Sequence, residues 1–196
     1  MHATDKAARV AGALYLVLGV IAVFGLMVVP GALIVRGDAA ATASKVLASE
    51  TLFRLGIASD LLGSVVFILL VLALYRLLSG VDRSRAALMV VFAVVSATIG
   101  FINALNNVAA LTLFRGGDFL AVLDETQREA LGMLFIRLHG QGHVINEVFW
   151  GLWLLPLGAL VSRSGFLPRI LGLWLIVAGF AWVALSATGL FAPQHA

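Results

Sequence analysis

The chain consists of long apolar stretches separated by short polar connections. Five stretches reach the length of about 20 mainly apolar residues that a helix needs to cross a ~30 Å hydrocarbon layer. They lie at residues 8–29, 55–78, 86–114, 133–161 and 170–190. This pattern predicts an all-α fold, an integral membrane bundle of about five transmembrane helices that forms a single domain over residues 1–196.

Two polar connections predict structure of their own. Residues 38–50 place Asp38 as a helix N-cap before an Ala-rich run, which indicates a short extramembrane amphipathic helix lying on the outer surface. Asp124 followed by Gln127 is typical of a capping box, so the fourth helix is expected to begin there, well before its apolar stretch. A helix of that length either projects from the membrane or bends at the glycines of residues 140–142.

The composition excludes a water-soluble globule. Hydrophobic residues make up 62% of the chain and charged residues 12%, whereas soluble domains are roughly 45–50% apolar and about 25% charged. The chain has no cysteine, which excludes disulfide frameworks, thiolate nucleophiles and cysteine-ligated metal sites.

The net charge of +3 comes from basic residues that surround the apolar stretches and form no continuous basic stripe, so no nucleic-acid partner is expected. With a cytoplasmic N-terminus, seven basic residues lie in the short inner connections and five in the longer outer ones. The inner set is Lys6, Arg9, Arg76, Arg83, Arg85, Arg163 and Arg169, and the outer set is Arg36, Lys45, Arg54, Arg115 and Arg128. This asymmetry favours a cytoplasmic N-terminus, and the Arg- and Ala-rich composition is typical of a bacterial protein, so the cytoplasmic membrane of a bacterium is the expected location.

Ionisable and amide side chains inside the apolar stretches are costly there, and each indicates a functional site. At about 100° per residue, the polar residues of the fourth stretch share one helical face, and the asparagines of the third stretch share another. Their depth predicts one outward-facing polar cavity between the second, third and fourth helices. The predicted ligand-binding residues are Arg54, Asp60, Asn103, Asn107, His139 and Asn146.

Three functions are compatible with such a cavity. It binds a small amphipathic ligand, a membrane lipid or a partner, with the outer arginines attracting an anionic headgroup. Alternatively, His139, His143 and Glu147, spaced i, i+4, i+8, and an oxygen of Asp60 bind Zn²⁺ or iron in a metal-dependent membrane enzyme. In the third interpretation the same side chains hydrogen-bond one another in a structural subunit of a membrane complex.

Several segments resemble a bacterial multi-pass membrane family known as domain of unknown function 4386. They are residues 6–15 (KAARVAGALY), 37–42 (GDAAAT), 53–60 (FRLGIASD), 138–140 (LHG), 149–151 (FWG) and 164–172 (SGFLPRILG). The resemblance covers nearly the whole chain and implies an integral membrane protein without an established activity. The family pattern includes Arg54, Asp60 and His139 but not His143 or Glu147, which implies that any shared role belongs to the first three.

Overall fold

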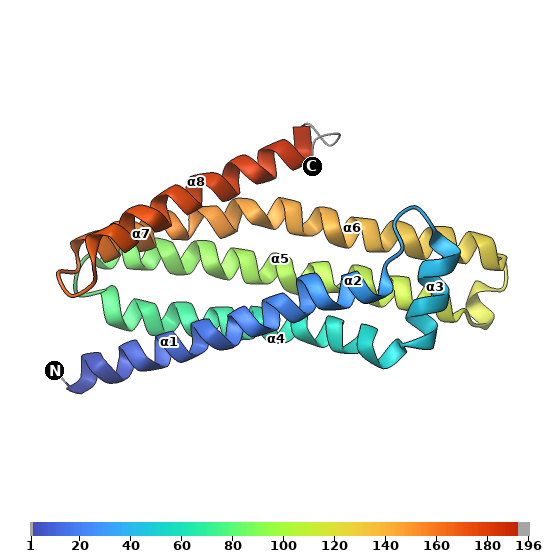
Figure 1. Cartoon of the computed structure of the whole chain (residues 1–196), viewed down its shortest axis with the longest axis horizontal. Helices are drawn as coiled ribbons and strands as arrows, with labels where there is room; N and C mark the ends of the chain where they lie inside the picture. The colour runs from blue at the N-terminus through green and yellow to red at the C-terminus, as the bar shows by residue number, and fades with distance from the viewer. Residues whose placement is uncertain (1, 192–196) are drawn as a thin grey trace. The chain divides into compact units, whose positions relative to one another are not determined.

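The computed structural model describes residues 2–191, which form helices joined by short connections (Figure 1). The elements are α1 (His2–Val23), the π-helical turn η1 (Phe24–Val28), α2 (Val29–Leu33), α3 (Ala39–Ala48), α4 (Glu50–Leu78), α5 (Arg83–Arg115), the 3-10 turn η2 (Asp118–Leu120), α6 (Glu125–Leu152), α7 (Leu154–Arg163) and α8 (Arg169–Phe191). No strand occurs within residues 2–191, which confirms the predicted all-α class.

Five helical segments among the described residues are long and apolar enough to cross a membrane. They cover Lys6–Leu33, Glu50–Leu78, Arg83–Arg115, Glu125–Arg163 and Arg169–Phe191. The predicted five-helix membrane fold is therefore confirmed. Each segment is longer than the corresponding apolar stretch because helical hydrogen bonding continues through polar end residues that an apolar pattern does not count.

The fourth segment begins with the predicted capping box. The Asp124 Oδ1 atom accepts a hydrogen bond from the Gln127 amide at 2.8 Å, and the Gln127 Oε1 atom accepts one from the Asp124 amide at 3.0 Å. The segment is 39 residues long, which is about 58 Å at ~1.5 Å per residue. It therefore exceeds the ~30 Å thickness of the hydrocarbon layer.

The helix is interrupted at Trp153, between α6 and α7, and not at the glycines. Helix α6 runs through Gly140 and Gly142 without a break in its hydrogen bonding. Pro156 gives a physical reason for the observed position, because it has no N–H to donate to the Leu152 carbonyl four residues earlier.

The predicted short helix after residue 38 is present as α3. The Asp38 carboxylate caps it by accepting a hydrogen bond from the Ala41 amide at 2.8 Å. The helix ends at Ala48 because Ser49 leaves the helical conformation, with φ −128° and ψ 43°. Glu50 then begins α4, so the predicted range of 38–50 is divided between two helices.

The described residues form two compact units, and several helices contribute to both. The α3 unit comprises residues 19–63 and 100–142, and the α8 unit comprises residues 2–18, 64–99 and 143–191. Helices α4, α5 and α6 each pass from one unit into the other. The candidate site described below lies in the α3 unit.

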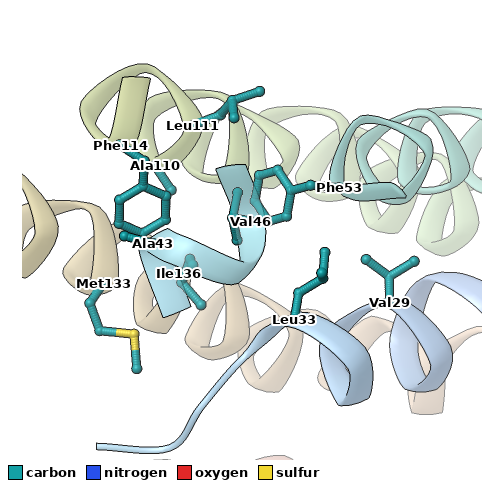
Figure 2. Packing of buried hydrophobic residues seen from close by; sticks show 10 residues of the cluster. All are labelled: Val29, Leu33, Ala43, Val46, Phe53, Ala110, Leu111, Phe114, Met133 and Ile136. Carbon is teal, nitrogen blue, oxygen red and sulfur yellow. The ribbon is translucent and has the colours of Figure 1, made fainter. Parts of the chain in front are cut away.

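The α3 unit has its own hydrophobic core, to which α2, α3, α4, α5 and α6 all contribute. Helix α3 runs across the direction of the long helices of this unit (Figure 1). Figure 2 shows Val46 of α3 next to Phe53 of α4, and Ala43 of α3 next to Phe114 of α5. Because these four side chains are buried, α3 fixes the start of α4 and the end of α5 in one core.

The α8 unit is held by close helix packing as well as by its core. Helices α7 and α8 lie side by side (Figure 1), and their backbones approach each other at Gly158 and Gly172. A Cβ atom added at Gly158 of α7 would lie 2.6 Å from the carbonyl oxygen of Gly172 in α8. Small residues at such contacts are typical of helix association in membranes, where apolar burial alone gives little driving force.

Candidate functional site

A groove of about 490 Å³ lies between the first turns of α4 and the last turns of α5, in the α3 unit. Volumes of about 300–1,000 Å³ are typical of small-molecule sites. Helix α4 contributes Arg54, Ile57, Ala58 and Leu61, and α5 with the residue after it contributes Val108, Leu111, Thr112, Arg115 and Gly116.

The groove is cationic at one end. Arg54 and Arg115 reach it from different helices, and both side chains are half exposed. The Glu50 carboxylate joins them: its Oε1 atom accepts a hydrogen bond from Arg54 Nε at 2.7 Å, and its Oε2 atom lies 3.6 Å from Arg115 Nε. A single carboxylate therefore holds two guanidinium groups together at the end of the groove.

The rest of the groove is lined mainly by apolar side chains. Leu61 and Val108 are 40% and 44% exposed, so the groove also has an open apolar side. Leu111 lies deeper and is 5% exposed. The combination of a cationic end and apolar walls matches a molecule with an anionic head and a hydrocarbon tail.

A polar cluster formed by Asp60, Asn103, Asn107 and His139 occupies a separate place in the α3 unit. The His139 Nε2 atom lies 3.4 Å from Asp60 Oδ2, which links α6 to α4. The Asn107 side chain donates a hydrogen bond to the Asp60 carboxylate and so links α5 to α4. The structure thus brings together four of the six residues predicted to bind a ligand, whereas Arg54 lines the groove.

Asn103 and His139 bind each other's backbone. The Asn103 Nδ2 atom donates to the His139 carbonyl oxygen at 2.9 Å, and the His139 Nδ1 atom lies 3.1 Å from the Asn103 carbonyl oxygen. Asn106 completes the arrangement by donating from Nδ2 to Asn103 Oδ1 at 2.9 Å. These contacts fix the orientation of the His139 imidazole, which is 15% exposed.

The π-helical turn η1 approaches the same cluster from α1. A Cβ atom added at Gly25 would lie 3.5 Å from Asp60 Oδ1 and closer still to the hydroxyl of Ser59. Pro30 follows η1 and lacks the N–H that would donate to Leu26, which favours an irregular helical register at this point. Only a glycine at position 25 allows the backbone to come this close to α4.

The other predicted site residues belong to the α8 unit. Asn146 is buried and donates from Nδ2 to the Ser96 carbonyl oxygen at 3.2 Å. The His143 ring centroid lies 5.9 Å from that of Trp150, and Glu147 is partly buried on the same helix. The roles of His143 and Glu147 as metal ligands stay predictions.

Glu50, which contacts both arginines at the end of the groove, is a residue that the sequence did not indicate as part of a site. It was expected at the end of the surface helix, but it begins α4 and contacts both arginines. Its spacing of four residues from Arg54 is the signal that indicates an ion pair on one helical face. The contact between Glu50 and Arg115, 65 residues further along the chain, is not predicted by any local sequence pattern.

Comparison with known proteins places the chain in a family without adding an activity. No curated protein and no solved structure matches it. A family model described as Domain of unknown function (DUF4386) matches residues 10–196, a range that includes the groove and the polar cluster. The chain therefore belongs to the DUF4386 family of membrane proteins.

Proposed function

We propose that the protein binds an anionic membrane lipid with its phosphate headgroup at Arg54 and Arg115 and an acyl chain along the groove between α4 and α5. The observation that carries this proposal is the pairing of two arginines from different helices at one end of an apolar groove. Guanidinium groups bind phosphate through two parallel hydrogen bonds, and two such groups favour an anion over a zwitterion.

The charge at this end of the groove supports an anionic headgroup. Glu50 already places carboxylate oxygens at 2.7 Å from Arg54 Nε and 3.6 Å from Arg115 Nε. The two guanidinium groups are therefore arranged to donate hydrogen bonds to the oxygen atoms of an anion. The Arg115 contact is longer than an optimal hydrogen bond, which leaves this guanidinium available to a second anion.

The position of the groove supports a ligand that comes from the bilayer. Its walls include Leu61 and Val108, both exposed on helices that are apolar enough to cross a membrane. An acyl chain enters such an open side without first crossing water. Because the chain moves from lipid and not from water, its contact with the apolar walls contributes little driving force, and the arginines supply the preference for this lipid.

The basic residues of the connections support a cytoplasmic N-terminus in the cytoplasmic membrane of a bacterium, which puts the arginine end of the groove at the outer leaflet. The absence of cysteine from the chain makes this orientation directly testable. A single cysteine introduced at Gly80, between α4 and α5, is expected to resist an impermeant maleimide in intact cells. One introduced at Asp118, between α5 and α6, is expected to react, and the reverse labelling pattern would contradict this orientation.

Lipid binding is tested with the purified protein and native mass spectrometry in the presence of phosphatidylglycerol or phosphatidylcholine. The wild-type protein is expected to retain phosphatidylglycerol preferentially. Replacing both Arg54 and Arg115 with glutamine is expected to remove that preference, with at least about a tenfold loss in affinity, the size of one charge-assisted contact. Arg36→Gln, which removes an exposed arginine of the same unit outside the groove, is the matched control. Equal retention of both lipids by the wild-type protein would refute the proposal.

A further inference from the structure

The contacts of His139 determine which of its ring nitrogens carries a hydrogen. The Nδ1 atom lies 3.1 Å from the Asn103 carbonyl oxygen. A carbonyl oxygen only accepts hydrogen bonds, so Nδ1 is the protonated nitrogen in this contact. In the neutral imidazole the lone pair is then on Nε2, the atom that faces Asp60.

The Nε2 atom of His139 and the Oδ2 atom of Asp60 therefore present two lone pairs to each other. They are 3.4 Å apart, and the two side chains are only 15% and 12% exposed. Two acceptors at this separation repel each other unless a positive group lies between them. That group is a proton, carried by the imidazole or by the carboxyl group, or a metal cation.

The separation favours a metal cation. A charge-assisted hydrogen bond between a nitrogen and a carboxylate oxygen is about 2.7–2.9 Å long, shorter than the 3.4 Å found here. Zinc bonds of about 2.0–2.1 Å to nitrogen and 2.0–2.2 Å to oxygen, in tetrahedral geometry, hold the two ligand atoms about 3.3–3.5 Å apart. The observed distance of 3.4 Å between His139 Nε2 and Asp60 Oδ2 agrees with the zinc geometry.

The neighbouring side chains complete the pattern expected around metal ligands. A histidine that binds a metal usually donates its other ring N–H to a carbonyl or carboxylate, and a carboxylate that binds a metal is itself hydrogen-bonded. Here the Asn103 carbonyl oxygen faces His139 Nδ1 at 3.1 Å, and the Asn107 side chain donates to the Asp60 carboxylate. Both ligands are thus held in place from α5.

We propose that His139 Nε2 and Asp60 Oδ2 bind a divalent transition-metal ion of the zinc class. Imidazole nitrogen together with carboxylate oxygen suits Zn²⁺ and Fe²⁺, whereas Mg²⁺ and Ca²⁺ prefer oxygen ligands alone. His139 and Asp60 supply two of the ligands of such a tetrahedral site. The ion links α4 to α6 within the α3 unit.

The proposal is tested by metal titration of the full-length protein, purified with an affinity tag that contains no histidine and stripped with a chelator. One Zn²⁺ per chain is expected. Asp60→Asn and His139→Gln are each expected to weaken binding by more than the about 10–100-fold typical of losing an outer-shell partner. Asp118→Asn, an exposed acid of the same unit, is the matched control and is expected to bind like the wild type.

A second measurement does not depend on any variant. Co²⁺ bound to wild-type protein in tetrahedral geometry gives visible absorption bands, and added Zn²⁺ is expected to abolish them. Absence of stoichiometric Zn²⁺ or of these bands in the wild-type protein overturns the proposal. Zinc binding of wild-type strength in both Asp60→Asn and His139→Gln overturns it as well, since the bound ion would then lie elsewhere.

Discussion

His139 on α6 and Asn103 on α5 are joined by a reciprocal pair of contacts, in which each side chain binds the other residue's backbone carbonyl, at 3.1 and 2.9 Å. Backbone carbonyl oxygens within a helix normally accept hydrogen bonds only from N–H groups of the same helix. This pair therefore adds polar contacts between two apolar helices. Inside a membrane, where apolar burial contributes little to helix association, such contacts and close backbone packing decide which helices meet.

The close approach of α6 to Asn103 predicts opposite effects for two neighbouring glycines. A Cβ atom at Gly142 would overlap with the Asn103 amide, whereas one at Gly140 would meet nothing within 4 Å. Gly142→Ala is expected to lower the free energy of unfolding by about 1–3 kcal/mol, the cost of overpacking. Gly140→Ala is expected to raise it by up to about 1 kcal/mol through helix propensity. Both changes in the free energy of unfolding are measured by monitoring unfolding in detergent with circular dichroism. Equal effects of the two substitutions would argue against the contact between Gly142 and Asn103.

Removing the Asn103 side chain tests the hydrogen bonds directly. Asn103→Ala deletes the donor to the His139 carbonyl and the acceptor for Asn106. The free energy of unfolding is expected to fall by about 1–2 kcal/mol, the size found for hydrogen bonds between membrane helices. Thr98→Ala is a suitable comparison because Thr98 is exposed and donates a hydrogen bond to the Val94 carbonyl of its own helix. A loss for Asn103→Ala no larger than for Thr98→Ala would show that the contact between the helices contributes nothing.

Much of the fold could be predicted from the sequence because the membrane imposes a strong pattern. Apolar length alone indicates five spans, and local capping chemistry indicates the starts of α3 at Asp38 and of α6 at Asp124. The break at Trp153 was not predicted, because the apolar pattern continues through it and the glycines at 140 and 142 indicated a different place for a bend. Helical structure continues through those glycines, and Gly142 is the place where Asn103 packs.

The candidate site could be predicted only in part. Counting residues from the ends of the spans indicated that Asp60, Asn107 and Glu147 lie at a similar depth. The structure places Asp60 in contact with Asn107 and His139, whereas Glu147 belongs to the α8 unit. The groove could not be located in this way. Its cationic end depends on the packing of the start of α4 against the end of α5, and that packing follows from tertiary contacts around Phe53 rather than from any local pattern.

The glycine contacts between α7 and α8 predict a sensitive position in the α8 unit. Gly158→Ala places a Cβ atom 2.6 Å from the Gly172 carbonyl oxygen and 2.7 Å from Ile176 Cγ1. Backbone atoms cannot rotate away as side chains do, so the two helices have to separate. A loss of about 1–3 kcal/mol in the free energy of unfolding is expected. Gly19→Ala on α1, where a Cβ atom meets nothing within 4 Å, is the control for replacing a membrane glycine.

Glu50 competes with any anionic headgroup at the end of the groove, because its carboxylate contacts both Arg54 and Arg115. Glu50→Gln keeps the shape of the side chain but removes the charge, so the two guanidinium groups become available to the lipid phosphate. Affinity for phosphatidylglycerol is expected to rise by about three- to tenfold, the effect of one exposed ion pair and the removal of a repulsive charge. Native mass spectrometry at graded lipid concentrations measures the change, with Glu129→Gln, another acid of the α3 unit that does not line this groove, as the control. Weaker lipid binding in Glu50→Gln would mean that Glu50 mainly positions the arginines, and the headgroup would then have to bind together with the carboxylate rather than in its place.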